Sequence, residues 1–158
     1  NQKGVEQDSI KNFSNKIKVA KRSTISEDFL IIARIESFIL EKGLKDALKR
    51  AEAYSKAGAD AILIHSKEKS PKQIFDFAKK FSKSANYKPL VCVPSTYSQV
   101  YEKELIRHGF KIVIYANHLM RSSYPSMVDT AKNILKFKRS FPIEKNISSA
   151  KEMIELIK

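Results

Sequence analysis

The sequence has few of the residues that mark secreted, membrane or metal-binding proteins. Among its 158 residues are one cysteine and no tryptophan, and its longest apolar runs, such as residues 29–33 and 59–64, have the length of strands. A single cysteine excludes an internal disulfide, and Cys92 stands in the apolar run 90–93, where we expect a small buried hydrophobic residue. We therefore expect a soluble protein of the reducing cytoplasm, with no membrane partner.

Positive charge is what the sequence has in excess. Lysine and arginine total 30 against 17 acidic residues, which gives a formal net charge of +13. Such a charge attracts partners that carry phosphate, from nucleic acids to small anions. The lysines of the predicted helices face away from the apolar stripes, and no basic cluster is interleaved with aromatic residues as base stacking requires. We expect a solvated basic surface and no nucleic-acid partner, with a basic nucleic-acid-binding module as the alternative.

Helical and strand patterns alternate along the chain. Apolar residues at helical spacing separate short continuous apolar runs, which is typical of strand–helix units around a buried parallel sheet. The predicted strands cover residues 29–35, 61–65, 89–93 and 111–116. The predicted helices cover residues 9–22, 44–57, 70–81 and 98–108, then a long helix that ends near residue 138 and a last one over residues 149–158.

Capping residues predict where three of these helices begin. Asp8 is available as the N-cap of the first helix. Ser70 with Gln73, and Ser149 with Glu152, have the spacing of capping boxes.

Four strand–helix units fit two architectures, an open doubly wound sheet and a portion of a (β/α)8 barrel. A complete barrel would need about 250 residues. No interdomain linker is visible, so we expect one partial domain over residues 1–158. The chain starts with Asn1 and no signal-peptide pattern follows, so we expect a chain boundary there. In both architectures functional residues gather at the carboxyl ends of the strands.

Polar residues stand at these strand ends. Arg34 and Glu36 are two residues apart, so in an extended strand both side chains leave the same face and could pair. The spacing fits a buried structural ion pair and an anion site equally well; a planar guanidinium suits a phosphoryl group. His65 ends the next strand, where it could reach the same anion, although a lone histidine after an apolar run is more often a core residue.

Four motifs at these strand ends resemble a known family. They are FLIIARIES at residues 29–37, EAYSKAGADAILIHS at residues 52–66, PLVCVPSTY at residues 89–97 and VIYANHLMRSS at residues 113–123. In order and spacing they are similar to the second half of the phosphoenolpyruvate mutase and phosphonopyruvate hydrolase branch of the isocitrate lyase superfamily. The resemblance implies the C-terminal half of a (β/α)8 barrel, with about four βα units plus C-terminal helices.

The resemblance also implies an activity. The family interconverts phosphoenolpyruvate and phosphonopyruvate by intramolecular phosphoryl transfer, an isomerase reaction of phosphonate biosynthesis, with Mg2+ on the pyruvyl oxygens. Phosphonopyruvate hydrolysis is the alternative, and a carbon–carbon lyase of the same superfamily is a weaker one. The family's dimers exchange a helix after the fourth of these strands, which implies a homodimer or homotetramer with helix swapping.

Three residues receive roles from the resemblance. Arg34 and His65 match the family's phosphoryl-binding residues and are the implied catalytic and substrate-binding side chains, and Glu36 matches a supporting acidic position. The family's metal-ligating aspartates and its gating loop precede the region present here. We therefore expect no Mg2+ ligand in this chain, and no activity from the chain alone.

Overall fold

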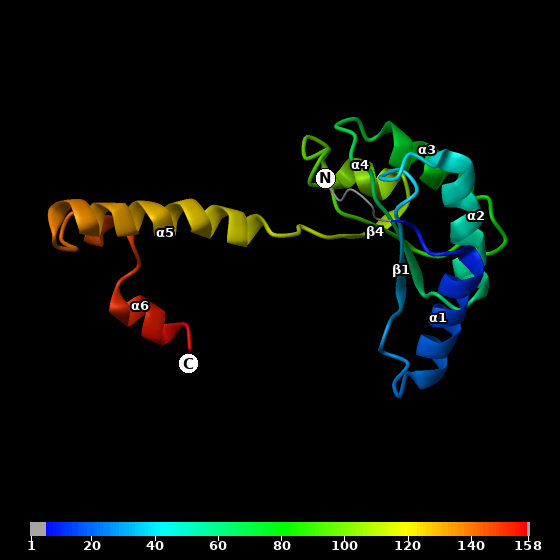
Figure 1. Ribbon diagram of the computed structural model, residues 1–158, viewed down its shortest axis with the longest axis horizontal. Helices are drawn as coiled ribbons and strands as arrows, with labels where there is room; N and C mark the ends of the chain where they lie inside the picture. The colour runs from blue at the N-terminus through cyan, green and yellow to red at the C-terminus, as the bar shows by residue number, and fades with distance from the viewer. Residues whose placement is uncertain (1–5, 158) are drawn as a thin grey trace. The chain divides into compact units, whose positions relative to one another are not determined.

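The structure, a computed structural model, describes residues 6–157, and the chain divides into two compact units between Ala116 and Asn117. The first unit holds all four strands and the second holds the long helix (Figure 1). The strands and helices alternate in the predicted order.

The first unit is built on a parallel sheet in which the strands lie side by side in chain order. The strands are β1 (Ile32–Ile35), β2 (Ala61–Ile64), β3 (Leu90–Cys92) and β4 (Phe110–Val113). The helices are α1 (Ile10–Ser23), α2 (Gly43–Lys56), α3 (Lys72–Phe81) and α4 (Glu102–Arg107). A helix follows each strand, as expected of repeated βα units, because a parallel neighbour requires a crossover connection.

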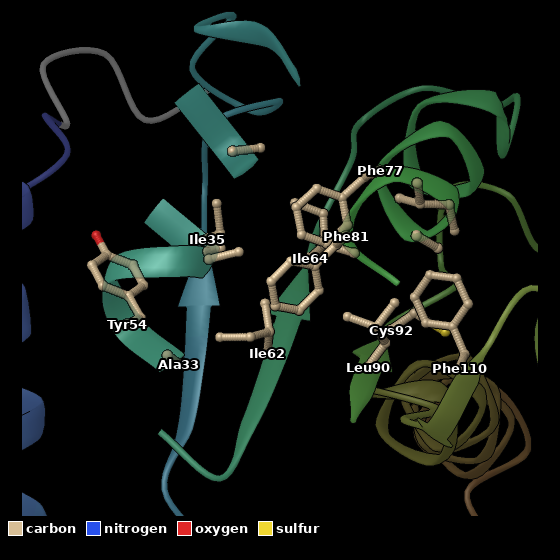
Figure 2. Close-up of a cluster of buried hydrophobic side chains, with 14 of the residues drawn as sticks. Ala33, Ile35, Tyr54, Ile62, Ile64, Phe77, Phe81, Leu90, Cys92 and Phe110 are labelled. Carbon is tan, nitrogen blue, oxygen red and sulfur yellow. The ribbon is translucent and has the colours of Figure 1, made fainter. Parts of the chain in front are cut away.

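One face of the sheet packs against the helices and forms the main core. Side chains alternate between the two faces of a strand, so every second residue of β1 and β2 enters this core. Figure 2 shows strand side chains meeting aromatic rings from α2 and α3. The core residues labelled there are Ala33, Ile35, Tyr54, Ile62, Ile64, Phe77, Phe81, Leu90, Cys92 and Phe110. Cys92 is fully buried, as predicted.

The opposite face, which we name the open face, carries the row Arg34, Leu63, Val91 and Ile112 across the four strands. Leu63 and Val91 belong to a second, smaller apolar cluster. Lys111 is an extra residue in β4, since Leu90 pairs with Phe110 while Val91 pairs with Ile112. This bulge rotates the following residues by one position, which keeps Ile112 on the open face.

Several predicted elements are longer than the observed ones. The first strand begins at Ile32 because Phe29 and Leu30, although apolar, are 64% and 56% exposed and pair with no strand. The second, third and fourth strands end at Ile64, Cys92 and Val113. The fourth helix is only Glu102–Arg107, because the residues from 98 to 100 form turns.

The prediction of helix caps is right for the last helix, wrong for the first and partly right for α3. Ser9 caps α1 by accepting from the amide of Asn12, and Asp8 instead accepts from Lys16. At the start of α3, Ser70 accepts a hydrogen bond from the amide of Lys72, as predicted, but Gln73 accepts from Ser66 and closes no capping box. The capping box of Ser149 and Glu152 is present.

The second unit consists of α5 (His118–Phe137), the short 3-10 helix η1 (Glu144–Asn146) and α6 (Ala150–Glu155). The predicted end of the last helix at Lys158 lies outside the described residues. No residue of α5 is buried, and its apolar side chains Met120, Tyr124, Met127 and Leu135 are largely exposed. Within residues 6–157 no helix is both long and apolar enough to cross a membrane.

Candidate functional site

Arg34 and Glu36 stand together at the carboxyl end of β1. Nε of Arg34 donates a hydrogen bond to Oε1 of Glu36, which confirms that the spacing of two residues brings these side chains into a pair. The pair is not buried, since the side chain of Arg34 is 50% exposed and that of Glu36 is 30% exposed. An exposed pair contributes little to stability, so stability alone does not account for an arginine at a strand end.

His65 follows the last residue of β2 and joins this pair. Register places Ile35 beside Ile64, so the next residues along the two parallel strands, Glu36 and His65, are neighbours across the strand ends. Burial lowers the pKa of the half-buried imidazole; the charge of Arg34 lowers it further, while Glu36 opposes both effects. His65 is therefore predominantly neutral at pH 7.

Two side chains of this cluster have polar atoms without a hydrogen-bond partner among the described residues. Among the described residues, Nδ1 of His65 is buried without a hydrogen-bond partner. Within the same part of the chain, Arg34 is hydrogen-bonded only through Nε, and its two terminal nitrogens have no protein acceptor. A guanidinium fork beside an imidazole can bind an anion with several oxygens, since arginine recognises carboxylate and phosphate groups through two parallel hydrogen bonds.

Buried serines follow both strand ends, and sequence reasoning missed them. Ser37 comes directly after Glu36 and Ser66 directly after His65, and both are 0% exposed. The repeated position of a serine after each polar strand end was the signal available in the sequence.

Metal-binding residues do not gather in the described part of the chain. Residues 6–157 contain no group of three or more histidine, cysteine, aspartate or glutamate side chains that could hold a metal ion. Mg2+ prefers carboxylate and water oxygens in octahedral geometry, and Glu36 is already paired with Arg34. The described residues therefore do not fit a magnesium centre.

The fold and this site define a parallel βα half-barrel with a guanidinium and an imidazole at adjacent strand ends. The family described as phosphoenolpyruvate phosphomutase matches residues 1–135, and the chain belongs to this family. It is 40% identical over 147 residues to a phosphoenolpyruvate phosphomutase of Tetrahymena pyriformis, a match that covers 93% of this chain and 48% of that protein. The chain thus spans about half the length of the curated relatives it matches.

Solved structures give the same result. A phosphoenolpyruvate phosphomutase from Streptomyces platensis subsp. rosaceus superposes with a TM-score of 0.89 at 39% identity, over 96% of this chain and 52% of that one. A phosphonopyruvate hydrolase in complex with oxalate and Mg2+ superposes with a TM-score of 0.88 at 36% identity, over 96% and 53% of the two chains. The prediction of half of a (β/α)8 barrel is confirmed.

Proposed function

We propose that the whole protein interconverts phosphoenolpyruvate and phosphonopyruvate by moving the phosphoryl group between oxygen and carbon, as an isomerase of phosphonate biosynthesis. The observation that carries this proposal is the proximity of Arg34 and His65 at adjacent strand ends of a chain from the phosphoenolpyruvate phosphomutase family. Residues 1–158 would form one partial barrel domain.

In this proposal the described residues bind and orient the phosphoryl group. The terminal nitrogens of Arg34, which have no acceptor within residues 6–157, hold two phosphoryl oxygens, and the neutral imidazole of His65 donates one hydrogen bond to a third. Glu36 has the supporting role of fixing the guanidinium plane through Nε. Phosphoryl transfer has a loose transition state with charge on the peripheral oxygens, so positioned donors supply most of the catalysis that this half offers.

We propose Mg2+ as the cofactor of the whole protein, with ligands from outside residues 6–157. Two observations support this: the hydrolase relative was solved with oxalate and Mg2+, and the described residues hold no cluster of metal ligands. Such an ion would neutralise negative charge on the substrate. We accordingly expect the present chain to be inactive by itself.

The test is phosphorus NMR of the full-length protein with phosphonopyruvate and Mg2+. A mutase converts the phosphonate resonance into that of phosphoenolpyruvate, with no inorganic phosphate. The alternative function is hydrolysis, supported by a hydrolase relative whose identity and TM-score lie close to those of the mutase. Inorganic phosphate as the sole phosphorus-containing product, formed together with pyruvate, would show that the protein is a hydrolase. No turnover would exclude both functions, and the carbon–carbon lyase reaction would then be assayed.

We also propose that the partners are the small-molecule substrate and further copies of the chain, not a nucleic acid or a membrane. A homodimer or homotetramer with exchange of α5 is supported by the exposed apolar side chains of that helix. A cytoplasmic location is supported by the single, fully buried cysteine, Cys92. Light scattering on a sizing column measures the oligomeric state directly.

A further inference from the structure

The chain repeats one arrangement at the ends of β1 and β2. In each case a polar site residue, Glu36 or His65, is followed by a fully buried serine, Ser37 or Ser66. In each case the serine hydroxyl donates a hydrogen bond to a side chain on the first turn of the helix that follows. A buried hydroxyl needs such a partner, because leaving it unsatisfied is unfavourable.

Ser66 is held by three hydrogen bonds from three different places. Its Oγ donates to Oε1 of Gln73 in α3 at 2.7 Å and accepts from the amide of Glu68 at 3.1 Å. Its carbonyl accepts from Oγ1 of Thr96, in the loop after β3, at 2.9 Å. The backbone next to His65 is therefore fixed by the following helix, by its own loop and by the neighbouring loop.

Ser37 is also held by hydrogen bonds to the following helix and to its own loop. Its Oγ donates to Oδ2 of Asp46 in α2 at 2.7 Å, and its carbonyl accepts from the amide of Lys42 at 2.8 Å. Asp46 also accepts from Nε of the buried Arg50 at 2.9 Å. Burial alone would raise the pKa of Asp46, but the hydrogen bonds from Ser37 and Arg50 hold it below its usual value. Asp46 thus stays an ionised acceptor for the serine at neutral pH.

We propose that Ser37 and Ser66 are positioning residues that set the orientation of the Arg34–Glu36 pair and of His65 for the anion they bind. The proposal rests on the proposed function for the identity of that anion only. It adds to that function by assigning indirect roles to two serines, neither of which forms a hydrogen bond with Arg34 or His65.

The reason lies in how little else orients the imidazole. Nδ1 of His65 has no hydrogen-bond partner among the described residues, so no hydrogen bond to that nitrogen fixes its ring. The direction in which the side chain leaves the strand end is set by the backbone at residues 65 and 66, which the bonds of Ser66 hold. A binding group misplaced by a small distance loses a large part of its effect, so these bonds matter for ligand affinity as well as for folding.

The experiment uses the full-length protein with isotope-labelled histidine and compares four variants. Ser66→Ala removes the buried hydroxyl. Thr96→Val removes the donor to the carbonyl of Ser66 from an exposed position, where misfolding is not expected, and Thr96→Ser keeps the donor. Ser55→Ala is the matched control, because Ser55 is also buried but its hydroxyl has no hydrogen-bond partner among the described residues.

Two readouts are measured at constant pH after thermal melts establish folding. NMR relaxation of the His65 ring without ligand reports its order, and a titration with inorganic phosphate reports anion affinity. We expect Ser66→Ala and Thr96→Val to loosen the ring and weaken phosphate binding about two- to tenfold, the effect of losing one hydrogen bond. Thr96→Ser and Ser55→Ala should stay within about twofold of the parent protein.

The outcomes separate this proposal from the proposed function. An unchanged ring order in Thr96→Val, with or without a lower melting temperature, overturns the positioning role, and it does so even where Ser66→Ala fails to fold. A loosened ring in Thr96→Val but not in Thr96→Ser supports the role even if wild-type protein turns over no phosphonopyruvate. In that last case the proposed function fails and the positioning role stands.

Discussion

At the scale of the residue, Arg34 is the side chain whose loss should be most costly for activity. Replacing it with alanine in the full-length protein removes a fixed positive donor, and we expect turnover to fall by about 10²–10³. Arg34→Lys should recover only part of this, because an ammonium cannot form the two parallel bonds of a guanidinium. The exposed Arg22 in α1 offers the control, and near-normal rates for Arg34→Ala would make Arg34 structural.

His65 gives a prediction about pH. Its pKa is lowered by burial and by Arg34, so a bound anion, which favours the charged imidazole, must raise it. Linkage then requires anion affinity to increase as pH falls through the pKa of His65. Sulfate binding followed by calorimetry between pH 5 and 8 checks this, because sulfate keeps its charge over that range. The His65→Asn variant should give a flat profile, and a flat profile in the parent protein would exclude His65 from the site.

Cys92 should be chemically inert in the folded protein. Burial raises the pKa of its thiol to about 12, and the thiolate is the reactive form. We expect no reaction with a disulfide reagent at pH 8 over the time in which the denatured protein reacts completely. Labelling of the native protein at the denatured rate would show that the core around β3 opens readily.

At the scale of the element, Asp60 connects the beginning of β1 to α1. Its carboxylate accepts from the amide of Ile31 at 2.9 Å and from Nζ of Lys21 at 2.7 Å. Burial would raise the pKa of Asp60, but these two donors lower it below 3.8. We expect Asp60→Ala to reduce the free energy of unfolding by about 1–3 kcal/mol, measured by urea denaturation at pH 7.

The same carboxylate predicts the sign of a pH effect. A lowered folded-state pKa contributes stability above the unfolded value of 3.8, and this stability is lost as pH falls through the folded pKa. The difference between the parent protein and Asp60→Asn should therefore shrink in acid. Lys21→Met leaves intact the hydrogen bond that the amide of Ile31 donates to Asp60. It should therefore reduce the free energy of unfolding at pH 7 by less than Asp60→Ala does.

Local patterns predicted the elements and part of the site. The order of strands and helices follows from apolar periodicity, and the Arg34–Glu36 pair follows from a spacing of two in a strand. The predicted strands are too long because apolar runs extend beyond the paired residues; the run before Ile32, for example, begins ahead of the first paired residue. The bonds of Ser66 were not predictable, since its partners Gln73 and Thr96 are 7 and 30 residues away and are brought close only by the fold.

At the scale of the whole molecule, the apolar side chains of α5 make the oligomeric state testable. Met127 is 58% exposed on a helix without buried residues, and such a surface is unusual unless another chain covers it. In a proposed dimer that exchanges this helix, Met127→Asp would bury a charge at the interface. We expect this variant to run as a monomer in light scattering while the parent protein runs as a dimer or tetramer.

The matched control is Lys132→Asp, which adds a negative side chain at an exposed polar position of the same helix. It should leave the assembly intact, because the ammonium it replaces faces water. The two variants separate burial from charge: if both dissociate the assembly, electrostatics rather than apolar contact holds it. If neither does, or if the parent protein is itself a monomer, α5 is not the interface, and its apolar residues are then expected to bind a hydrophobic dye in the full-length protein.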